Sequence, residues 1–322
     1  MHIVIVTPSS RDSHTGNQIT TLRWSKILRQ LGARVTVQQK YDGKQCDLLV
    51  ALHARRSYAS VRRSHTQFPN RPIVLALTGT DLYRDIRQHQ KAVRSLQWAT
   101  RLVVLQNDAI HYVPRPLQHK TRVIYQSARH PTGKHVPLKN VFEVCVIGHL
   151  RAVKDPFRAA MAARLLPSAS QIRVDHFGAA LTPAMQHRAV LETERNARYH
   201  WHGDVPPWRV LRRLARSQLL VLTSRLEGGA NVVSEAIAAQ VPVISTRISG
   251  TIGLLGRDYP GYFRVGDTHR LAKQLQRAEL DPCFYGRLKS ACQQKLDLVD
   301  PQRELASWRQ LITELTEQKI LG

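Results

Sequence analysis

The stretch SQLLVLTSRLEGGANVVSEAIAAQVPVIST, residues 217–246, constrains the fold of this 322-residue chain more than any other. An apolar run over Leu219–Leu222 is followed by a glycine-containing loop, a helical run to Ala239 and a second apolar run over Val241–Ser245. A strand, a helix and a second strand in this order form a βαβ unit, which requires a parallel sheet. The sequence therefore predicts an α/β fold whose ligand lies at the carboxyl edge of such a sheet.

The glycine loop of this stretch leads directly into a helix amino terminus. Unpaired N–H groups and a partial positive charge favour an anion there, so the backbone of Gly228–Asn231 is a candidate cradle for a phosphate oxygen. Glu227 and Glu235 bracket this backbone, and eight residues return a helical side chain close to the same face. One carboxylate could meet a substrate hydroxyl and the other a ribose. Spacing alone leaves open that Glu227 is a first-turn charge and Glu235 a solvated helix residue.

The segment EGGANVVSEA resembles the E-x7-E motif of nucleotide-sugar glycosyltransferases with the GT-B fold, which consists of two facing Rossmann-like domains. The resemblance implies that Glu227 is catalytic and contacts the donor sugar, and that Glu235 binds the ribose. It also implies that the residues between them bind the sugar or the diphosphate, namely Gly228, Gly229, Ala230, Asn231 and Val232.

A second basic segment follows the apolar run Val141–Ile147, which predicts the first strand of another domain. It reads GHLRAVKDP, and by composition alone its cations could be plain surface charge. The segment resembles the G-x-L-x-x-x-K stretch of the same family, whose basic residues neutralise the leaving diphosphate. Lys154 aligns directly and Gly148 marks the start of the loop. His149 stands where the family usually has Arg, so Arg151 and His149 both stay candidates for the second cation.

The first half of the chain contains six runs that predict parallel strands: His2–Thr7, Arg34–Gln38, Asp47–His53, Arg71–Leu77, Arg101–Leu105 and Arg122–Tyr125. Polar residues follow several of these runs and are expected at one sheet edge. Candidate acceptor-binding residues are His53, Arg55, Arg56, Thr78, Gly79, Thr80, Arg84 and Gln126. The adjacent arginines could equally form a solvated face, and Thr80 or Asp81 could cap a helix. Asp81 could otherwise act as a base or position a ligand.

Gly16 and Asn17 end a polar loop, PSSRDSHTGNQ, that precedes a helix expected from about Ile19 to Leu31. Ordinary turn and cap chemistry would explain them. In the GT-B comparison this loop approaches the sugar diphosphate or the acceptor.

Further along, Ile172–Phe177 and Tyr199–His202 predict two more strands, and the GT-B fold would place Gly203 near the nucleobase. The helix in VPPWRVLRRLARS is expected to turn its arginines outward. A final amphipathic helix over Glu304–Gln318 either ends the second domain or, as the resemblance implies, crosses back onto the first.

The domain division follows from the segment Ala128–Asn140, which has two prolines, a glycine and no hydrophobic period, and reads as a linker. We expect residues 1–135 to form an acceptor domain, residues 136–300 a nucleotide-sugar donor domain, and residues 301–322 the helix that returns to the first domain.

The net charge of +25 is the outlying property of the composition, with 48 Lys and Arg against 23 Asp and Glu. Such a charge favours polyanionic partners, diphosphates included. The basic residues are spread through both halves and no zinc-finger or RNP motif is present, so nucleic acid is not the expected partner. No apolar run is long enough to span a bilayer, and the start MHIVIVTPSS is too short and too polar for a signal peptide.

The four cysteines show no zinc-type spacing, and Cys46 and Cys145 are expected to be buried thiols. These features predict a reduced cytoplasmic enzyme. No carboxylate cluster of DxD type is present, and GT-B enzymes use no bound metal, so neither a metal nor another cofactor is expected. A UDP-sugar would be a co-substrate.

An ensemble of stretches extends the resemblance over most of the chain: IVTP…TGN, DLLVALHARRS, LALTGTDLYRD, VIYQSA, CVIGHLRAVKDPFRAA, RLEGGANVVSEAIAA and LLGRDYPGYFRVGDT. Together they resemble the selenosugar synthases of selenoneine biosynthesis, a small GT-B subfamily. These enzymes join a hexose from UDP-N-acetylglucosamine or UDP-glucose to selenophosphate. The resemblance implies that some of the acceptor residues bind this small anion.

Two other functions stay open from the sequence. The chain could be a glycosyltransferase with an alcohol acceptor of lipid, polysaccharide or small-molecule type, or a non-catalytic binder of sugar nucleotides or nucleic acid. The hexose, the anomeric outcome, the donor base and the oligomeric state are not determined at this level.

Overall fold

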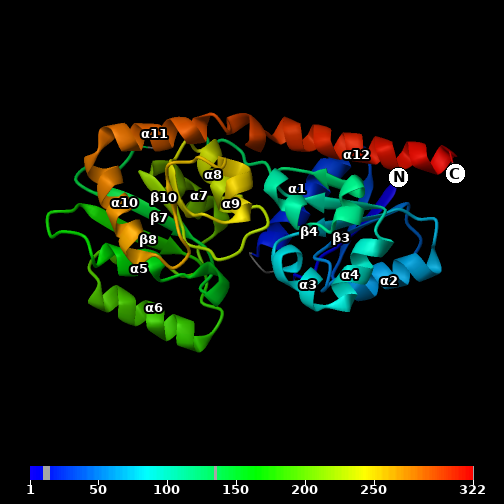
Figure 1. The fold of residues 1–322 in the computed structure, drawn as a ribbon, viewed down its shortest axis with the longest axis horizontal. Coiled ribbons are helices and arrows are strands. Elements are labelled where there is room, and N and C mark those ends of the chain that lie inside the picture. Colours follow the sequence, from blue (N-terminus) through cyan, green and yellow to red (C-terminus); the bar gives the residue numbers. More distant parts are fainter. Residues whose placement is uncertain (10–14, 134–135, 322) are drawn as a thin grey trace. The chain divides into compact units, whose positions relative to one another are not determined.

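The computed structural model describes residues 1–9, 15–133 and 136–321, with side chains up to residue 317. The chain forms two compact units, each built on its own parallel sheet (Figure 1). Unit 1 consists of Met1–Gln126, Glu227–Gly229 and the chain from Pro301 onward. Unit 2 consists of Ser127–Leu226 and Ala230–Asp300.

Unit 1 contains a six-stranded parallel sheet in the order β2-β1-β3-β4-β5-β6. Its strands are β1 His2–Val6, β2 Arg34–Gln38, β3 Leu48–Leu52, β4 Ile73–Leu77, β5 Arg101–Val104 and β6 Thr121–Val123. Its helices are α1 Gly16–Gln30, α2 Tyr58–Gln67, α3 Ile86–Gln88, α4 Gln90–Trp98 and α12 Pro301–Leu321, with shorter turns at Asp81–Asp85, Asn107–Tyr112 and Arg115–Lys120. Every residue of β3 and β4 is buried, as expected for strands covered on both faces.

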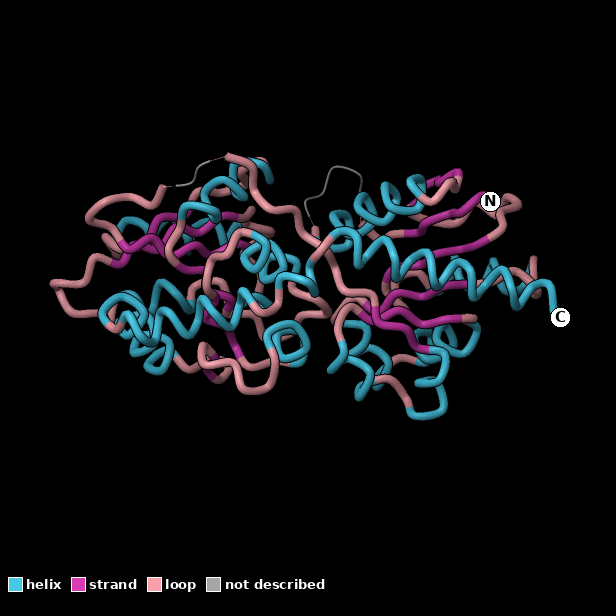
Figure 2. Tube along the Cα trace, turned by 90° about the horizontal axis from the view of Figure 1, so that it is seen from above, coloured by secondary structure: helices cyan, strands magenta, loops and turns pink. Residues whose placement is uncertain are grey.

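The two faces of this sheet carry separate hydrophobic clusters. On one face Trp24 and Leu28 of α1 pack with Trp308 of α12. On the other face Val61 of α2 and Leu96 of α4 pack against the opposite side chains of the strands. Figure 2 shows helices on both sides of the strands.

The carboxyl-terminal helix α12 is part of unit 1, which confirms that it returns to the first half of the chain. The rings of Trp24 and Trp308 meet edge to face with their centroids 4.9 Å apart. Glu304, which is 1% exposed, accepts a 2.7 Å hydrogen bond from Trp24 Nε1 and pairs with Arg23. The helix begins three residues earlier than predicted because Pro301 occupies its first turn, where a missing N–H costs nothing.

Unit 2 contains a second six-stranded parallel sheet in the order β12-β11-β10-β7-β8-β9. Its strands are β7 Phe142–Ile147, β8 Ile172–Phe177, β9 Tyr199–Trp201, β10 Leu219–Leu222, β11 Val243–Thr246 and β12 Tyr262–Phe263. Its helices are α5 Arg158–Ala163, α6 Pro183–Arg195, α7 Pro207–Arg216, α8 Asn231–Ala238, α9 Ser249–Leu255, α10 Thr268–Leu280 and α11 Pro282–Gln293, with short turns at Ala152–Lys154 and Leu296–Val299.

The strand order reverses once in each sheet. In unit 1 the chain passes from β1 to β2 on one side and continues from β3 on the other. In unit 2 it runs from β7 to β9 on one side and from β10 to β12 on the other. Ligands of open α/β sheets bind at the carboxyl ends of the strands where the order reverses, so each unit has one such position.

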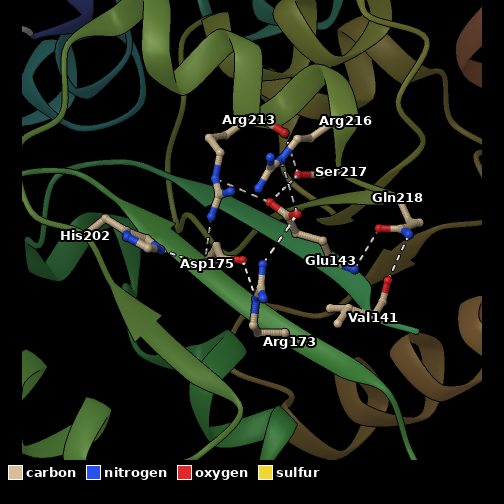
Figure 3. A network of polar contacts seen from close by, with 9 residues as sticks. All are labelled: Val141, Glu143, Arg173, Asp175, His202, Arg213, Arg216, Ser217 and Gln218. Carbon is tan, nitrogen blue, oxygen red and sulfur yellow. Dashed lines mark hydrogen bonds and ion pairs between the residues drawn. The ribbon is translucent and has the colours of Figure 1, made fainter. Parts of the chain in front are cut away.

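The expectation that the arginines of α7 turn outward is wrong for Arg213 and Arg216. Both reach the buried carboxylate of Glu143 on β7, at 3.7 Å and 3.6 Å (Figure 3). Arg213 also lies 3.7 Å from Asp175 on β8. Two buried acids on the sheet need counter-charges, and this helix supplies them.

Two further observations concern the described residues. The thiols of Cys46 and Cys145 are buried as expected, and so is that of Cys292. Within the described ranges, none of the helices combines the length and the apolar character that crossing a bilayer demands.

Candidate functional site

The loops after β7 and β10 flank the reversal point of the unit 2 sheet. The first is Gly148–Lys154, referred to below as the β7 loop. Its end is fixed by the chain that follows β10, because Thr223 Oγ1 donates to the carbonyl of Lys154 at 2.8 Å and Arg225 N donates to the carbonyl of Val153 at 2.8 Å. Lys154 is the residue predicted to neutralise the diphosphate, and these hydrogen bonds hold its backbone in place. Arg151, on the same loop, is exposed.

His149 lies earlier in the β7 loop and is held by β8's carboxyl end. Its Nδ1 accepts a 3.1 Å hydrogen bond from Ala179 N, and Leu150 N donates to the carbonyl of Ala179 at 2.8 Å. Because Nδ1 accepts, the neutral ring carries its proton on Nε2. A neutral His149 can therefore donate a hydrogen bond from Nε2, at the position where the GT-B glycosyltransferase motif that this segment resembles usually has Arg.

The second loop leads from β10 into α8. Ala230 is the N-cap of this helix and Asn231 its first residue, so the predicted phosphate cradle is a true helix amino terminus. Glu235 lies one turn further into the same helix, and Gly228 and Gly229 lie just before the cap. Ala230 and Val232 are both buried, at 2% and 8% exposure.

Gly203 follows β9 with a φ of +70°, a conformation that suits glycine. Its carbonyl accepts a 2.8 Å hydrogen bond from Gly178 N, which ties the ends of β8 and β9 together. The predicted nucleobase contact at Gly203 stays a prediction.

In unit 1, the order reverses between β1 and β3. Gly16 and Asn17 form the first turn of α1, and Thr15 caps it by accepting from Gln18 N at 3.4 Å. Ser10–His14 of the loop predicted here lie outside the described residues. Gln126, three residues after β6, is buried and donates from Nε2 to Thr20 Oγ1 at 2.5 Å.

Asp81 links the loops that follow β3 and β4. It is fully buried, and its Oδ1 accepts from Thr78 N at 3.0 Å and from Gly79 N at 2.9 Å. Its Oδ2 accepts from Ala54 N at 2.9 Å. Both carboxylate oxygens are thus engaged by backbone, which is the arrangement of a residue that positions two loops.

His53 directly follows β3 and has the left-handed conformation, with a φ of +72°. It is 3% exposed and its Nε2 lies 3.2 Å from Thr80 Oγ1. The ring therefore faces into the loop that follows β4 and fixes Thr80.

Asp85 is the residue at this edge that sequence reasoning missed. It is 2% exposed and pairs with Arg84 at 3.2 Å and Arg55 at 3.7 Å. His53 Nε2 lies 3.9 Å away. One signal was available, since Asp85 stands four residues after Asp81 in TDLYRD and adjoins Arg84. Arg56, the other arginine of the predicted pair, is exposed.

Among the residues that the structure describes, no three His, Cys, Asp or Glu side chains come together in a group that could hold a metal ion.

Residues 133–295, half of the chain, match the model of the family described as glycosyl transferases group 1. No curated protein is similar enough in sequence to count as a match.

Three solved structures share the fold. Alr3699/HepE of Anabaena, in complex with UDP and glucose, is 16% identical, with a TM-score of 0.75 over 99% of this chain and 100% of that one. Sucrose-phosphate synthase of Thermosynechococcus elongatus is 15% identical, with a TM-score of 0.76 over 98% and 99%. A glycosyltransferase of Rickettsia africae is 12% identical, with a TM-score of 0.72 over 98% of each chain. The predicted GT-B fold is confirmed.

Proposed function

Because the chain belongs to the family of glycosyl transferases group 1, we propose that it transfers a hexose from a UDP-sugar to selenophosphate, which makes a selenosugar. In this reaction a selenium lone pair attacks the anomeric carbon and forms the carbon–selenium bond. The bond from that carbon to the diphosphate oxygen breaks, and UDP leaves with the electron pair. Water then cleaves the phosphorus–selenium bond and releases phosphate.

The assignment of the donor site rests on one observation: two loops lie next to each other where the strand order of the unit 2 sheet reverses. Lys154 on the β7 loop and the amino terminus of α8 follow neighbouring strands, β7 and β10. A cation and preorganised N–H groups stabilise the negative charge that develops on a departing diphosphate. The UDP and UDP-glucose complexes of Alr3699/HepE support UDP as the nucleotide.

The assignment of selenophosphate as the acceptor rests on the residues at the carboxyl edge of the unit 1 sheet and on the sequence resemblance to selenosugar synthases. Arg55 and Arg84 flank the buried Asp85, and their side chains are 45% and 53% exposed. Two guanidinium groups against one carboxylate leave a net positive charge, with the arginines held in position. Arginine binds tetrahedral oxyanions in two-pronged fashion, which suits selenophosphate.

The decisive experiment is a mass-spectrometric assay with UDP-N-acetylglucosamine and selenophosphate. We expect a selenosugar mass with the unchanged protein. The yield of this product should fall by about 100-fold or more in Lys154→Ala and Glu227→Ala, since the loss of a charge-stabilising group lowers the rate by this much. Lys139→Ala, which removes an exposed lysine outside the site, should leave the yield unchanged.

Two outcomes would redirect the proposal. Release of UDP without a selenium product would retain the donor site and point to an alcohol acceptor. Failure to turn over this or any other nucleotide sugar would point to a binding protein.

The acceptor assignment is tested separately by kinetics. Arg55→Ala and Arg84→Ala should raise the KM for selenophosphate by about tenfold each, the effect of one lost charge-assisted hydrogen bond. Arg62→Ala, an exposed arginine on α2, is the matched control. An unchanged acceptor KM in both site variants would show that selenophosphate binds elsewhere.

A further inference from the structure

His176 connects three neighbouring strands of unit 2, namely the end of β7, β8 and the first residue of β9. It lies on β8 and is 1% exposed. Its Nε2 is 3.0 Å from the carbonyl of Gly148, the first residue of the β7 loop. Its Nδ1 is 2.9 Å from the hydroxyl of Tyr199 on β9.

The protonation state of His176 follows from these two contacts. A carbonyl oxygen only accepts, so Nε2 must carry the proton that it donates to Gly148. Burial lowers the pKa of His176 to about 4, so the ring is neutral near pH 7 and Nδ1 is an acceptor. Tyr199 therefore donates its hydroxyl proton to Nδ1. The tyrosine selects the tautomer that holds Gly148.

The Gly148 peptide is held closely by β8 and the turn after it. Gly148 N donates to the carbonyl of Phe177 at 2.9 Å. A Cβ at Gly178, whose φ is +150°, would lie only 2.2 Å from the carbonyl oxygen of Gly148. The backbone at Gly178 thus requires glycine, and its absent side chain makes room for the carbonyl that His176 binds.

We propose that His176 is a positioning residue for the nucleotide diphosphate, and that it acts by fixing the direction of the Gly148 carbonyl. Because a peptide unit is planar and trans, this carbonyl also determines the direction of the following N–H at His149. It thereby sets the course of the β7 loop toward Lys154. The inference rests on the proposed donor site.

The test compares two substitutions at position 176 by calorimetric titration with UDP. His176→Phe fills the space without a donor, and we expect the Kd for UDP to rise by about tenfold, the effect of one misdirected hydrogen-bonding peptide. His176→Gln can place its side-chain N–H near the position of Nε2, and we expect it to restore the affinity to within about threefold of the unchanged protein. In turnover, the loss in His176→Phe should appear in the KM for the UDP-sugar, with the acceptor KM unchanged.

A second pair of variants keeps the test informative if His176→Phe fails to fold. Tyr199→Phe removes the hydroxyl that selects the tautomer and should weaken UDP binding. Tyr259→Phe is the matched control, because its buried hydroxyl bonds to Val243 on β11 and to Cys292, away from the β7 loop. A purely structural role would lower the melting temperature in both tyrosine variants and leave the Kd of both unchanged.

The outcomes separate this inference from the proposed function. If the unchanged protein binds no UDP, the donor assignment fails. If it binds UDP, and folded His176→Phe and Tyr199→Phe bind it equally well, only the positioning role of His176 is overturned.

Discussion

Burial gives His176 a second measurable property at the scale of a single residue. Its pKa is about 4 in the folded protein and 6.5 in the unfolded chain, so between these values the unfolded state binds more protons. Its contribution to stability is complete above pH 6.5 and is lost as the pH falls toward 4. A shift of this size corresponds to roughly 3 kcal/mol.

The prediction is that His176→Gln, which does not titrate, flattens the decline of the unfolding free energy between pH 6.5 and 4. Urea unfolding of both proteins across this range measures it. Parallel curves for the two proteins would contradict the neutral, buried state of the histidine.

Asp81 is the second residue whose chemistry can be tested alone. Its carboxylate holds three backbone N–H groups that Asp81→Ala would leave unpaired, so we expect a loss of about 3 kcal/mol in unfolding free energy. Asp81→Asn retains one acceptor oxygen and should lose less stability and keep measurable activity. An inactive Asp81→Asn with unchanged stability would instead assign Asp81 as the base.

At the scale of an element, α12 packs on unit 1 through a buried indole, that of Trp308, together with Leu305, Leu311 and Leu315. Trp308 is fully buried against Trp24, and its truncation to Ala should cost about 4 kcal/mol. Trp308→Phe should cost less, because the indole N–H has no hydrogen-bond partner among the described residues. Trp208→Ala is the matched control, since that ring is 55% exposed. Chemical denaturation followed by circular dichroism compares the three variants.

The helix α7 contacts its sheet through ion pairs as well as through the buried side chains of Val210 and Leu214. Burial raises the pKa of Glu143, and the nearby Arg213 opposes this rise. Burial acts on Asp175 in the same direction, but hydrogen bonds from His202 and Arg173 outweigh it, so the pKa of Asp175 is lowered (Figure 3). The two acids thus need the surrounding cations to stay ionised.

Removal of one of these cations should therefore destabilise unit 2. We expect Arg213→Ala to cost about 2 kcal/mol, because it leaves buried carboxylates with less counter-charge. Arg212→Ala, at the exposed neighbouring position, should change the unfolding free energy by less than about 0.5 kcal/mol. Urea unfolding measures both variants. If Arg213→Ala changes the unfolding free energy as little as Arg212→Ala does, the ion-pair network contributes no stability.

At the scale of the whole molecule, the net charge of +25 favours non-specific binding to nucleic acid. We expect arbitrary duplex DNA to bind at about 0.05 M salt and to be released by about 0.2 M, because counterion release dominates such binding. UDP binding should persist at the higher salt. Fluorescence anisotropy with labelled DNA, with UDP as competitor, measures both. DNA that stays bound at the higher salt and displaces UDP would favour a nucleic-acid function.

Local sequence determined the elements of this protein with good accuracy. The runs at Arg34–Gln38, Ile172–Phe177 and Leu219–Leu222 are strands with the predicted bounds. The spacing of apolar residues along the chain indicates whether a segment is a strand or a helix, and this spacing can be read from the local sequence. The βαβ order then required parallel sheets and placed the glycine loops at their carboxyl edges.

Only the tertiary structure decided which side chains meet. The pairing of Asp85 with Arg55, of Arg213 with Glu143 and of His176 with Gly148 joins residues 28 or more positions apart in the chain. Such pairs depend on strand order and on the register between neighbouring strands, neither of which leaves a local pattern in the sequence. For this reason the sequence predicted the donor motifs, while the residues that hold those motifs in place became visible only in the folded chain.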